Sequence, residues 1–266
     1  YEFLPNDGTR PVNAKDNNVQ GLTIPIVTEA TTEEMSRRNP RADHYAMFKF
    51  IMDDLTKAES LIKYLTISDK TIPHLNVVYG LKARAYLWHA SFLEEFGKEG
   101  VPSNPYAGEN DTLTAEKAYD LAEKYARDAK GNSEPLTKEE WLSTTDGFNN
   151  KKFSSWMLAM TFVKEGSAVQ SGICNWASWI SNETTFGYAS AGPIVKASTA
   201  FYEGISDKDF RKLSYKAPAG SKLAGKEQRL VDDETWETYP DYASLKFRPG
   251  QGNMEDYNVG AAVDVP

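Results

Sequence analysis

The stretch that decides the fold is HLNVVYGLKARAYLWHASFLEEFG, residues 74–97. Its large apolar side chains recur at steps of three and four residues, the period of one face of an α-helix. The stripe comprises Val78, Leu81, Ala85, Trp88, Phe92 and Phe96, and Gly97 is a residue type typical of a helix end. Small side chains at Ala83, Ala85 and Ala90 permit close approach of another helix. The sequence therefore predicts a helix that packs tightly against its neighbours.

Two further amphipathic segments flank this helix. Residues 43–65 begin with Asp43 as a plausible N-cap and carry a stripe of Phe48, Ile51, Met52, Leu55, Ala58, Ile62 and Leu65. Residues 114–131 begin with Thr114, end at Gly131 and have an alanine-rich face of Ala118, Leu121, Ala122, Tyr125, Ala126 and Ala129. Both segments are predicted to be helices, and the alanine-rich face predicts tight packing against larger side chains.

Outside these helices the pattern is weaker. Residues 1–43 are expected to form an extended lead-in with one short helix near TTEEMSRR, and residues 132–266 to be rich in loops. One short helix is expected within 193–205 and a strand at 245–247, whereas the apolar run 153–162 fits either a helix or a strand. Such a long, sparsely structured region is typical of binding loops. The expected fold is mainly α, with a tetratricopeptide-like scaffold over 44–131 and a loop-rich, ligand-facing half after it.

Composition excludes several classes of function. The chain has 266 residues, enough for one large domain or two modest ones, and a formal net charge of −8, which argues against a nucleic-acid partner. No apolar run approaches the length of a membrane span. A single cysteine, Cys174, allows no internal disulfide, and the three histidines show no metal-ligand spacing. No metal and no cofactor is expected.

The most informative polar region is NWASWISNETTFGY, residues 175–188. Four large rings stand there without a continuous apolar face, which suits stacking on the C–H face of a sugar while amides bind its hydroxyls. The predicted ligand-binding residues are Trp176, Trp179, Phe186, Tyr188, Asn175 and Asn182. A second set, in ETWETYPDY at 234–242, contributes Trp236 and Tyr239, with Tyr242 beside them. For both sets the alternative is local packing under a long loop.

Catalytic patterns are weak. Asp53–Asp54 and Asp232–Asp233 are adjacent carboxylates, but the first pair falls on a helix surface and the second in a loop, where neighbours in sequence rarely converge on one bond. His89 lies one step off an apolar stripe and is expected to be a partly buried helix residue. No nucleophile elbow occurs. We therefore expect no catalytic residues and no enzymatic activity.

Several segments, in order, resemble one known family. They are LTIPIVTEATTEEMSRRN (22–39), FKFIMDDLTKAESLI (48–62), YGLKARAYLWHASF (79–92), AEKAYDLAEKYARDA (115–129) and FYEGISDKDFRK (201–212). Together they are similar to the SusD/RagB family of Bacteroidetes outer-membrane nutrient-binding lipoproteins. The resemblance covers roughly residues 22–247. It does not extend to the acylated N-terminal cysteine or the flanking helices that are typical of that family. The chain, which starts at Tyr1, is therefore expected to be the central portion of a family member.

The resemblance implies a protein on the cell-surface side of the outer membrane, lipid-anchored in its full-length parent. It implies an oligosaccharide ligand that is delivered to a SusC-like TonB-dependent transporter. The alternatives are a peptide-binding member of the same family, a helical scaffold that binds only protein and, as the weakest, a glycosidase.

Overall fold

The chain forms two compact units. The computed structural model describes residues 21–96, 113–143, 151–161, 182, 194–227, 233–245 and 264–265. Unit 1 comprises Tyr1–Thr66 and Pro73–Gly131, and unit 2 comprises Ile67–Ile72 and Asn132–Pro266. Helices account for 49% of the described residues, which confirms a mainly helical fold. The main boundary between the two units follows Gly131, the residue at which the last predicted helix ends.

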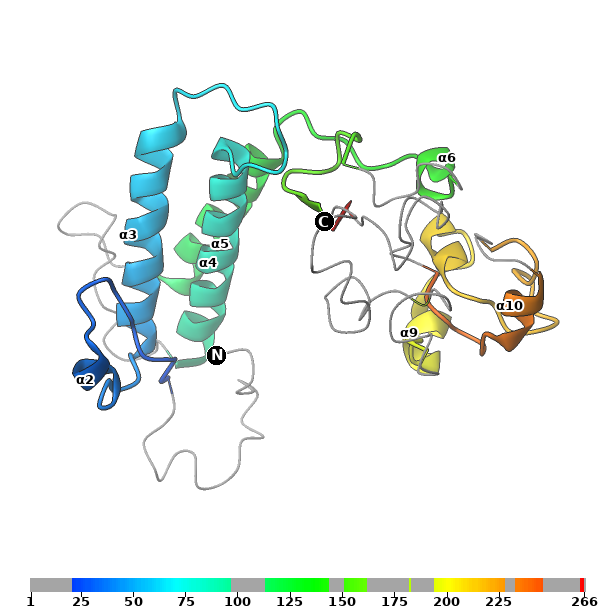
Figure 1. The fold of residues 1–266 in the computed structure, drawn as a ribbon, viewed down its shortest axis with the longest axis horizontal. Helices are drawn as coiled ribbons and strands as arrows, with labels where there is room; N and C mark the ends of the chain where they lie inside the picture. The colour runs from blue at the N-terminus through cyan, green and yellow to red at the C-terminus, as the bar shows by residue number, and fades with distance from the viewer. Residues whose placement is uncertain are drawn as a thin grey trace. The chain divides into compact units, whose positions relative to one another are not determined.

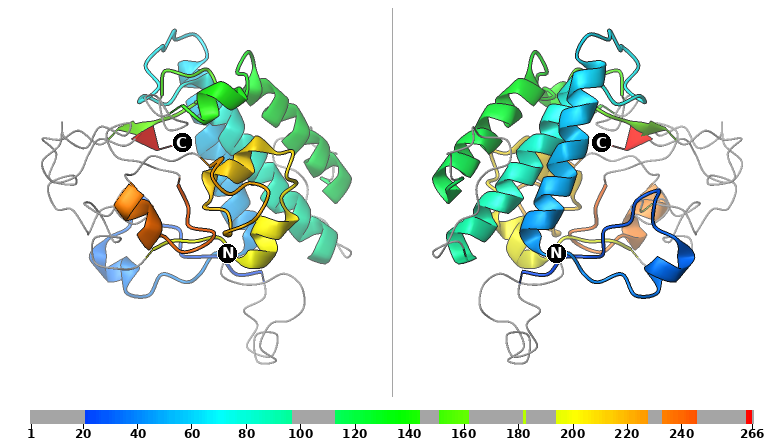
Figure 2. Two further views of the ribbon diagram at one scale, coloured as in Figure 1. Left: turned by 90° about the vertical axis from the view of Figure 1, so that its right-hand side faces the viewer. Right: turned by 90° about the vertical axis from the view of Figure 1, so that its left-hand side faces the viewer.

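Unit 1 is built on the three predicted helices. They are α3 (His44–Ile62), α4 (Leu75–Phe96) and α5 (Ala115–Lys130). Figure 1 shows them side by side, and α4 contacts both of the others. The ring of Phe48 meets Tyr86, and Tyr86 stacks on Tyr125, so one layer of aromatic rings crosses all three helices. The views in Figure 2 show the same packed group.

Capping fixes where these helices begin and end. The carboxylate of Asp43 accepts a hydrogen bond from the Ala46 N–H at 2.9 Å, and the hydroxyl of Thr114 accepts one from the Lys117 N–H at 3.2 Å. Both predicted N-caps are confirmed. Gly131 follows α5 with a φ of 48°, a value that favours glycine.

The core of unit 1 lies along α4. Its buried members are Phe48, Met52, Ala85, Tyr86, Ala90, Leu93, Leu113, Ala118 and Ala122. The alanine-rich face of α5 packs on larger side chains, as predicted. Three residues of the predicted apolar faces are wrong, however: Leu65 lies beyond the end of α3 and is 59% exposed, Leu81 is 44% exposed, and Ala126 on α5 is exposed.

The lead-in folds back on the start of α3. Leu22 forms a bridge with Asp43, and Arg41 donates from its Nε to the Thr23 carbonyl. A short helix, α2 (Glu33–Ser36), is capped by the side chain of Thr32. The predicted short helix in this region is confirmed.

Unit 2 contains only short elements among its described residues. They are α6 (Lys138–Trp141), α9 (Thr199–Gly204), the 3₁₀ helix η3 (Phe210–Ser214), α10 (Asp233–Thr238) and the two-residue strands β1 (Met160–Thr161) and β2 (Asp264–Val265). The two strands pair antiparallel. The short helix predicted within 193–205 is α9, and the ambiguous run 153–162 ends in β1.

No helix in the described parts of either unit is long and apolar enough to cross a membrane.

Candidate functional site

Asn182 is a polar residue of the predicted ligand set that lies within the described part of the chain, and its side chain hydrogen-bonds the backbone. Its amide nitrogen donates to the carbonyls of Val195 at 2.6 Å and Ser244 at 2.7 Å, and its oxygen accepts the Val195 N–H at 2.7 Å. The residue is only 4% exposed. Because all three bonds join separate segments of unit 2, Asn182 acts as a loop clamp. These bonds favour a structural role over its predicted role as a hydroxyl-binding amide.

Trp236 and Tyr239 lie in the interior of unit 2. They are 9% and 5% exposed and pack with Ala243, Leu245 and Ile194. The Tyr239 hydroxyl donates to the Asn182 carbonyl, so its polar end is also taken up inside the unit. Ring packing accounts for both side chains, and neither offers an exposed face for stacking. For these two residues the structure favours the packing alternative that the sequence left open.

The other predicted ligand residues fall elsewhere in the chain. Asn175, Trp176, Trp179, Phe186 and Tyr188 lie outside the described residues. Their role stays a prediction from the sequence.

A cluster of four rings, here called the aromatic cluster, lies in unit 2 beside the clamp. It consists of Phe201 and Tyr202 on α9, Tyr215 after η3, and Tyr242 after α10. Tyr215 meets Phe201 and Tyr202 edge to face, with ring centroids 6.1 and 6.4 Å apart, and Tyr202 meets Tyr242 at 4.9 Å. Tyr202 is buried, whereas Phe201 is 55% exposed and Tyr215 and Tyr242 are partly exposed. The cluster therefore has a buried base and an exposed edge.

Tyr242 is held in an unusual backbone conformation. Its φ is 68°, and among the described residues no other non-glycine residue has a positive φ. The Ala243 N–H donates to the Pro240 carbonyl, so Tyr242 is the third residue of a tight turn, where glycine or asparagine is favoured. Such a conformation costs about 1–2 kcal/mol for a residue with a Cβ.

Two other segments hold this turn. The Tyr242 N–H donates to the Lys216 carbonyl at 2.7 Å, and its own carbonyl accepts the Ala197 N–H at 3.0 Å. Isolated bridges pair Lys196 with Ala243 and Tyr215 with Ser244, the two residues that follow Tyr242. Backbone bonds from other segments thus hold Tyr242 in its strained conformation. Strained residues of this kind are concentrated at functional sites.

Three lysines, one buried and two partly buried, hold the loops of unit 2. Lys216 donates from its Nζ to the carbonyls of Trp236 at 2.8 Å and Tyr239 at 2.7 Å. Lys212, 4% exposed, donates to the Ile205 carbonyl and the Asp207 carboxylate, and its ammonium lies 4.5 Å from the centre of the Tyr202 ring. A third lysine, Lys70, donates to the carbonyls of Lys151 and Phe153. These charge-assisted bonds give the loops a fixed geometry without regular secondary structure.

Acidic groups surround the buried base of the aromatic cluster. Burial is the largest cause that raises the pKa of Tyr202 to about 12, and the charges of Glu227, Glu203 and Asp207 raise it further. Of these carboxylates, Asp207 pairs with Lys212 at 2.8 Å and Glu227 accepts the Ala217 N–H at 2.9 Å. Tyr202 is consequently a neutral phenol at ordinary pH and not a base.

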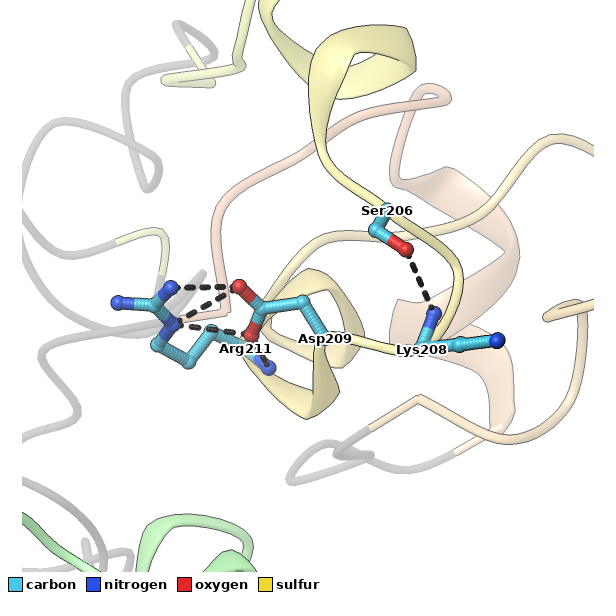
Figure 3. Close-up of polar contacts among 4 residues, drawn as sticks. All are labelled: Ser206, Lys208, Asp209 and Arg211. Atoms are coloured by element: carbon cyan, nitrogen blue, oxygen red, sulfur yellow. Dashed lines mark hydrogen bonds and ion pairs between the residues drawn. The ribbon is translucent and has the colours of Figure 1, made fainter.

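The loop between α9 and η3 carries the acid–arginine pair of the family-like segment (Figure 3). Asp209 caps η3, and its carboxylate binds the Arg211 guanidinium through Nε at 2.9 and 3.1 Å and through Nη2 at 2.5 Å. These hydrogen bonds lower the pKa of Asp209 to about 2. The hydroxyl of Ser206 accepts the Lys208 N–H at 3.2 Å. The whole motif is local, so it shapes the loop and converges on no common point for catalysis.

One of the remaining catalytic candidates is explained by its surroundings. Asp53 pairs with Lys49 on the exposed side of α3, as expected for solvated charge. Within the described residues no group of His, Cys, Asp and Glu side chains could hold a metal ion.

No family model, curated protein or solved structure matches the chain.

From the sequence, Tyr242 was noted beside the second set of predicted ligand residues, whereas Phe201 and Tyr215 were not singled out as exposed rings. Phe201 stands next to Tyr202 in a short helix, so one ring points inward and the other outward. The signal that could have found it is a pair of adjacent aromatics in a six-residue helix, which has one buried face only. Tyr215 gave no such signal, because its neighbours come from distant segments.

Proposed function

We propose that this chain binds a nutrient oligosaccharide at the cell surface, without turning it over, and delivers it to a TonB-dependent outer-membrane transporter. The class is that of the SusD/RagB-like lipoproteins, with the chain as the central part of one SusD-like domain. Sequence resemblance supplies the class, and the site supplies a physical basis for binding.

The observation that carries the proposal is the exposed ring of Phe201 on the short helix α9, within the aromatic cluster. A phenylalanine that is 55% exposed offers a flat apolar face to solvent. The rings below it and the lysine and asparagine clamps hold the surface in place before a ligand arrives. A pre-organised aromatic surface binds a flat C–H face at a small cost in conformational entropy.

The antiparallel helices of unit 1 support the second part of the proposal. The packed helices α3, α4 and α5, of which α3 and α5 begin at capped ends, suit a docking surface for the transporter. Exposed apolar side chains on these helices, such as Leu81 and Leu87, are available for such contacts.

The test is a glycan array probed with the intact chain, followed by titration of each hit. On the sequence prediction, Trp176→Ala and Trp179→Ala weaken binding by about 1–3 kcal/mol, the stacking value known for bases on aromatic side chains. Stability should move by less than about 1 kcal/mol in each variant if the rings lie at the surface. A loss of about 3–5 kcal/mol in stability with unchanged affinity would identify them as core residues instead.

The alternatives give different results in the same experiment. A peptide-binding family member would leave the glycan array blank and bind a peptide library. A pure protein scaffold would bind neither, yet would co-purify with a partner from native membranes. A glycosidase would release shorter sugars from the hit, and Asp232 and Asp233 would be the residues to replace.

A further inference from the structure

We infer that Phe201, Tyr215 and Tyr242 form a stacking surface for a pyranose ring of a neutral, hydroxyl-rich saccharide. The inference rests on the proposed function and assigns it a place and a ligand class. It goes beyond the sequence-predicted residues, because Phe201 and Tyr215 belong to neither predicted set.

The conformation of Tyr242 is the first step. Its turn position has a φ of 68°, which glycine adopts without steric cost. A turn selected for stability alone would favour glycine or asparagine there. Tyrosine supplies a ring instead, and that ring reaches Tyr202 at 4.9 Å while staying partly exposed. The strained position thus keeps a ring at the edge of the aromatic cluster.

The second step is the exposed edge itself. Phe201 is 55% exposed and is braced edge to face by Tyr215 at 6.1 Å. The partly exposed phenol of Tyr215 contacts Phe201, and that of Tyr242 joins the cluster through Tyr202. Phenol hydroxyls both donate and accept hydrogen bonds. An apolar face with hydroxyl groups around it matches a sugar ring, which has C–H groups on its faces and hydroxyls on its rim.

The surrounding charges set the ligand class. Glu203 follows Tyr202 on α9, is exposed, and pairs with no cation among the described residues. Its carboxylate can accept sugar hydroxyls but repels a uronic acid. A neutral saccharide meets this constraint, because its C–H faces can stack on the rings and its hydroxyls can donate to the Glu203 carboxylate.

The experiment titrates the whole chain with maltohexaose, cellohexaose and mannohexaose as neutral probes, hexagalacturonate as an acidic probe and oligolysine as a cationic one. We expect at least one neutral probe to bind and both charged probes to bind at least tenfold more weakly. Phe201→Ala and Tyr242→Gly should each raise the Kd of the neutral probe by about 5-fold to 150-fold, the range that corresponds to stacking energies.

Tyr64→Ala is the matched control. Tyr64 is an exposed ring at 83%, but it belongs to unit 1, so its loss should leave the Kd unchanged. Phe201→Ala removes an exposed side chain, so this variant separates binding from folding if Tyr242→Gly alters the turn. Melting curves of all three variants accompany the titrations.

Three outcomes would overturn the inference. If a neutral probe binds and both cluster variants keep the wild-type Kd, the surface is wrong while the proposed function stands. If hexagalacturonate or oligolysine binds best and the variants lose it, the surface is right and the ligand class is wrong. If the array and the probes yield no saccharide ligand, the inference and the proposed function both fail.

Discussion

His44 and His89 share a hydrogen bond inside unit 1, with Nε2 and Nδ1 separated by 2.8 Å. Phe92 stacks on His44 at 3.8 Å and Phe48 stacks on His89 at 3.9 Å, and the two histidines are 0% and 4% exposed. Burial lowers the pKa of His44 to about 3, helped by the nearby His89, and lowers the pKa of His89 to about 4. Both rings are therefore neutral in the folded chain at pH 7.

Acid should destabilise the chain through this pair. In the unfolded chain both pKa values return to about 6.5, so the unfolded state binds more protons below that pH. Stability is unaffected above about pH 6.5 and falls as the pH drops towards 4. At pH 5 the loss amounts to about 2 kcal/mol per histidine, and at most about 4 kcal/mol for the pair.

Urea unfolding between pH 7.5 and 4.5 measures this effect. The double variant His44→Leu/His89→Leu should have a shallower decline of stability with acid, whatever its stability at pH 7. An identical decline in wild type and variant would show that the pair does not titrate as the structure indicates.

At the scale of elements, two glycines of unit 1 make opposite contributions. Gly131 ends α5 with a φ of 48°, and a Cβ there would meet the Asn76 amide nitrogen at 3.2 Å. Gly80 lies inside α4, where a Cβ would make an ordinary contact with Ala129 at 3.8 Å. The same substitution is therefore expected to have opposite signs at the two positions.

Gly131→Ala should destabilise the chain by about 1–2 kcal/mol, from the cost of a Cβ in this backbone region. Crowding of Asn76, which donates to the Ala129 carbonyl at 3.0 Å, acts in the same direction. Gly80→Ala should stabilise it by about 0.5–1 kcal/mol, because alanine is the better helix former. Chemical denaturation of both variants is the measurement. Equal effects of the two substitutions would contradict the geometry at the end of α5.

The helices of unit 1 were predictable because each carries its own local signals. Asp43 and Thr114 are caps whose partners lie three residues away, and the apolar stripes need only the helical period. The clamp at Asn182 was not predictable, since its partners Val195 and Ser244 are 13 and 62 residues distant. The same holds for the His44–His89 bond, which spans 45 residues. From the sequence, Trp236 and Tyr239 were predicted to be surface stacking residues, because the polar residues beside them in the chain give no sign that their rings are buried.

At the scale of the whole molecule, we propose that the two units have different roles. Unit 1 gains its rigidity from regular helices with capped ends, whereas unit 2 fixes its loops with lysine and asparagine side chains. Loops held by such bonds keep the exposed edge of the aromatic cluster in one geometry. We therefore propose that ligand binding lies in unit 2 and that unit 1 is a scaffold.

The most direct test is equilibrium dialysis of the intact chain against the saccharide identified by the array, followed by analysis of the recovered sugar. We expect saturable binding that Phe201→Ala weakens at least fivefold and Tyr64→Ala leaves unchanged, with all of the sugar recovered at its original length. Shortened sugar products, or equal binding by wild type and Phe201→Ala, would contradict a non-enzymatic binding protein with its site in unit 2.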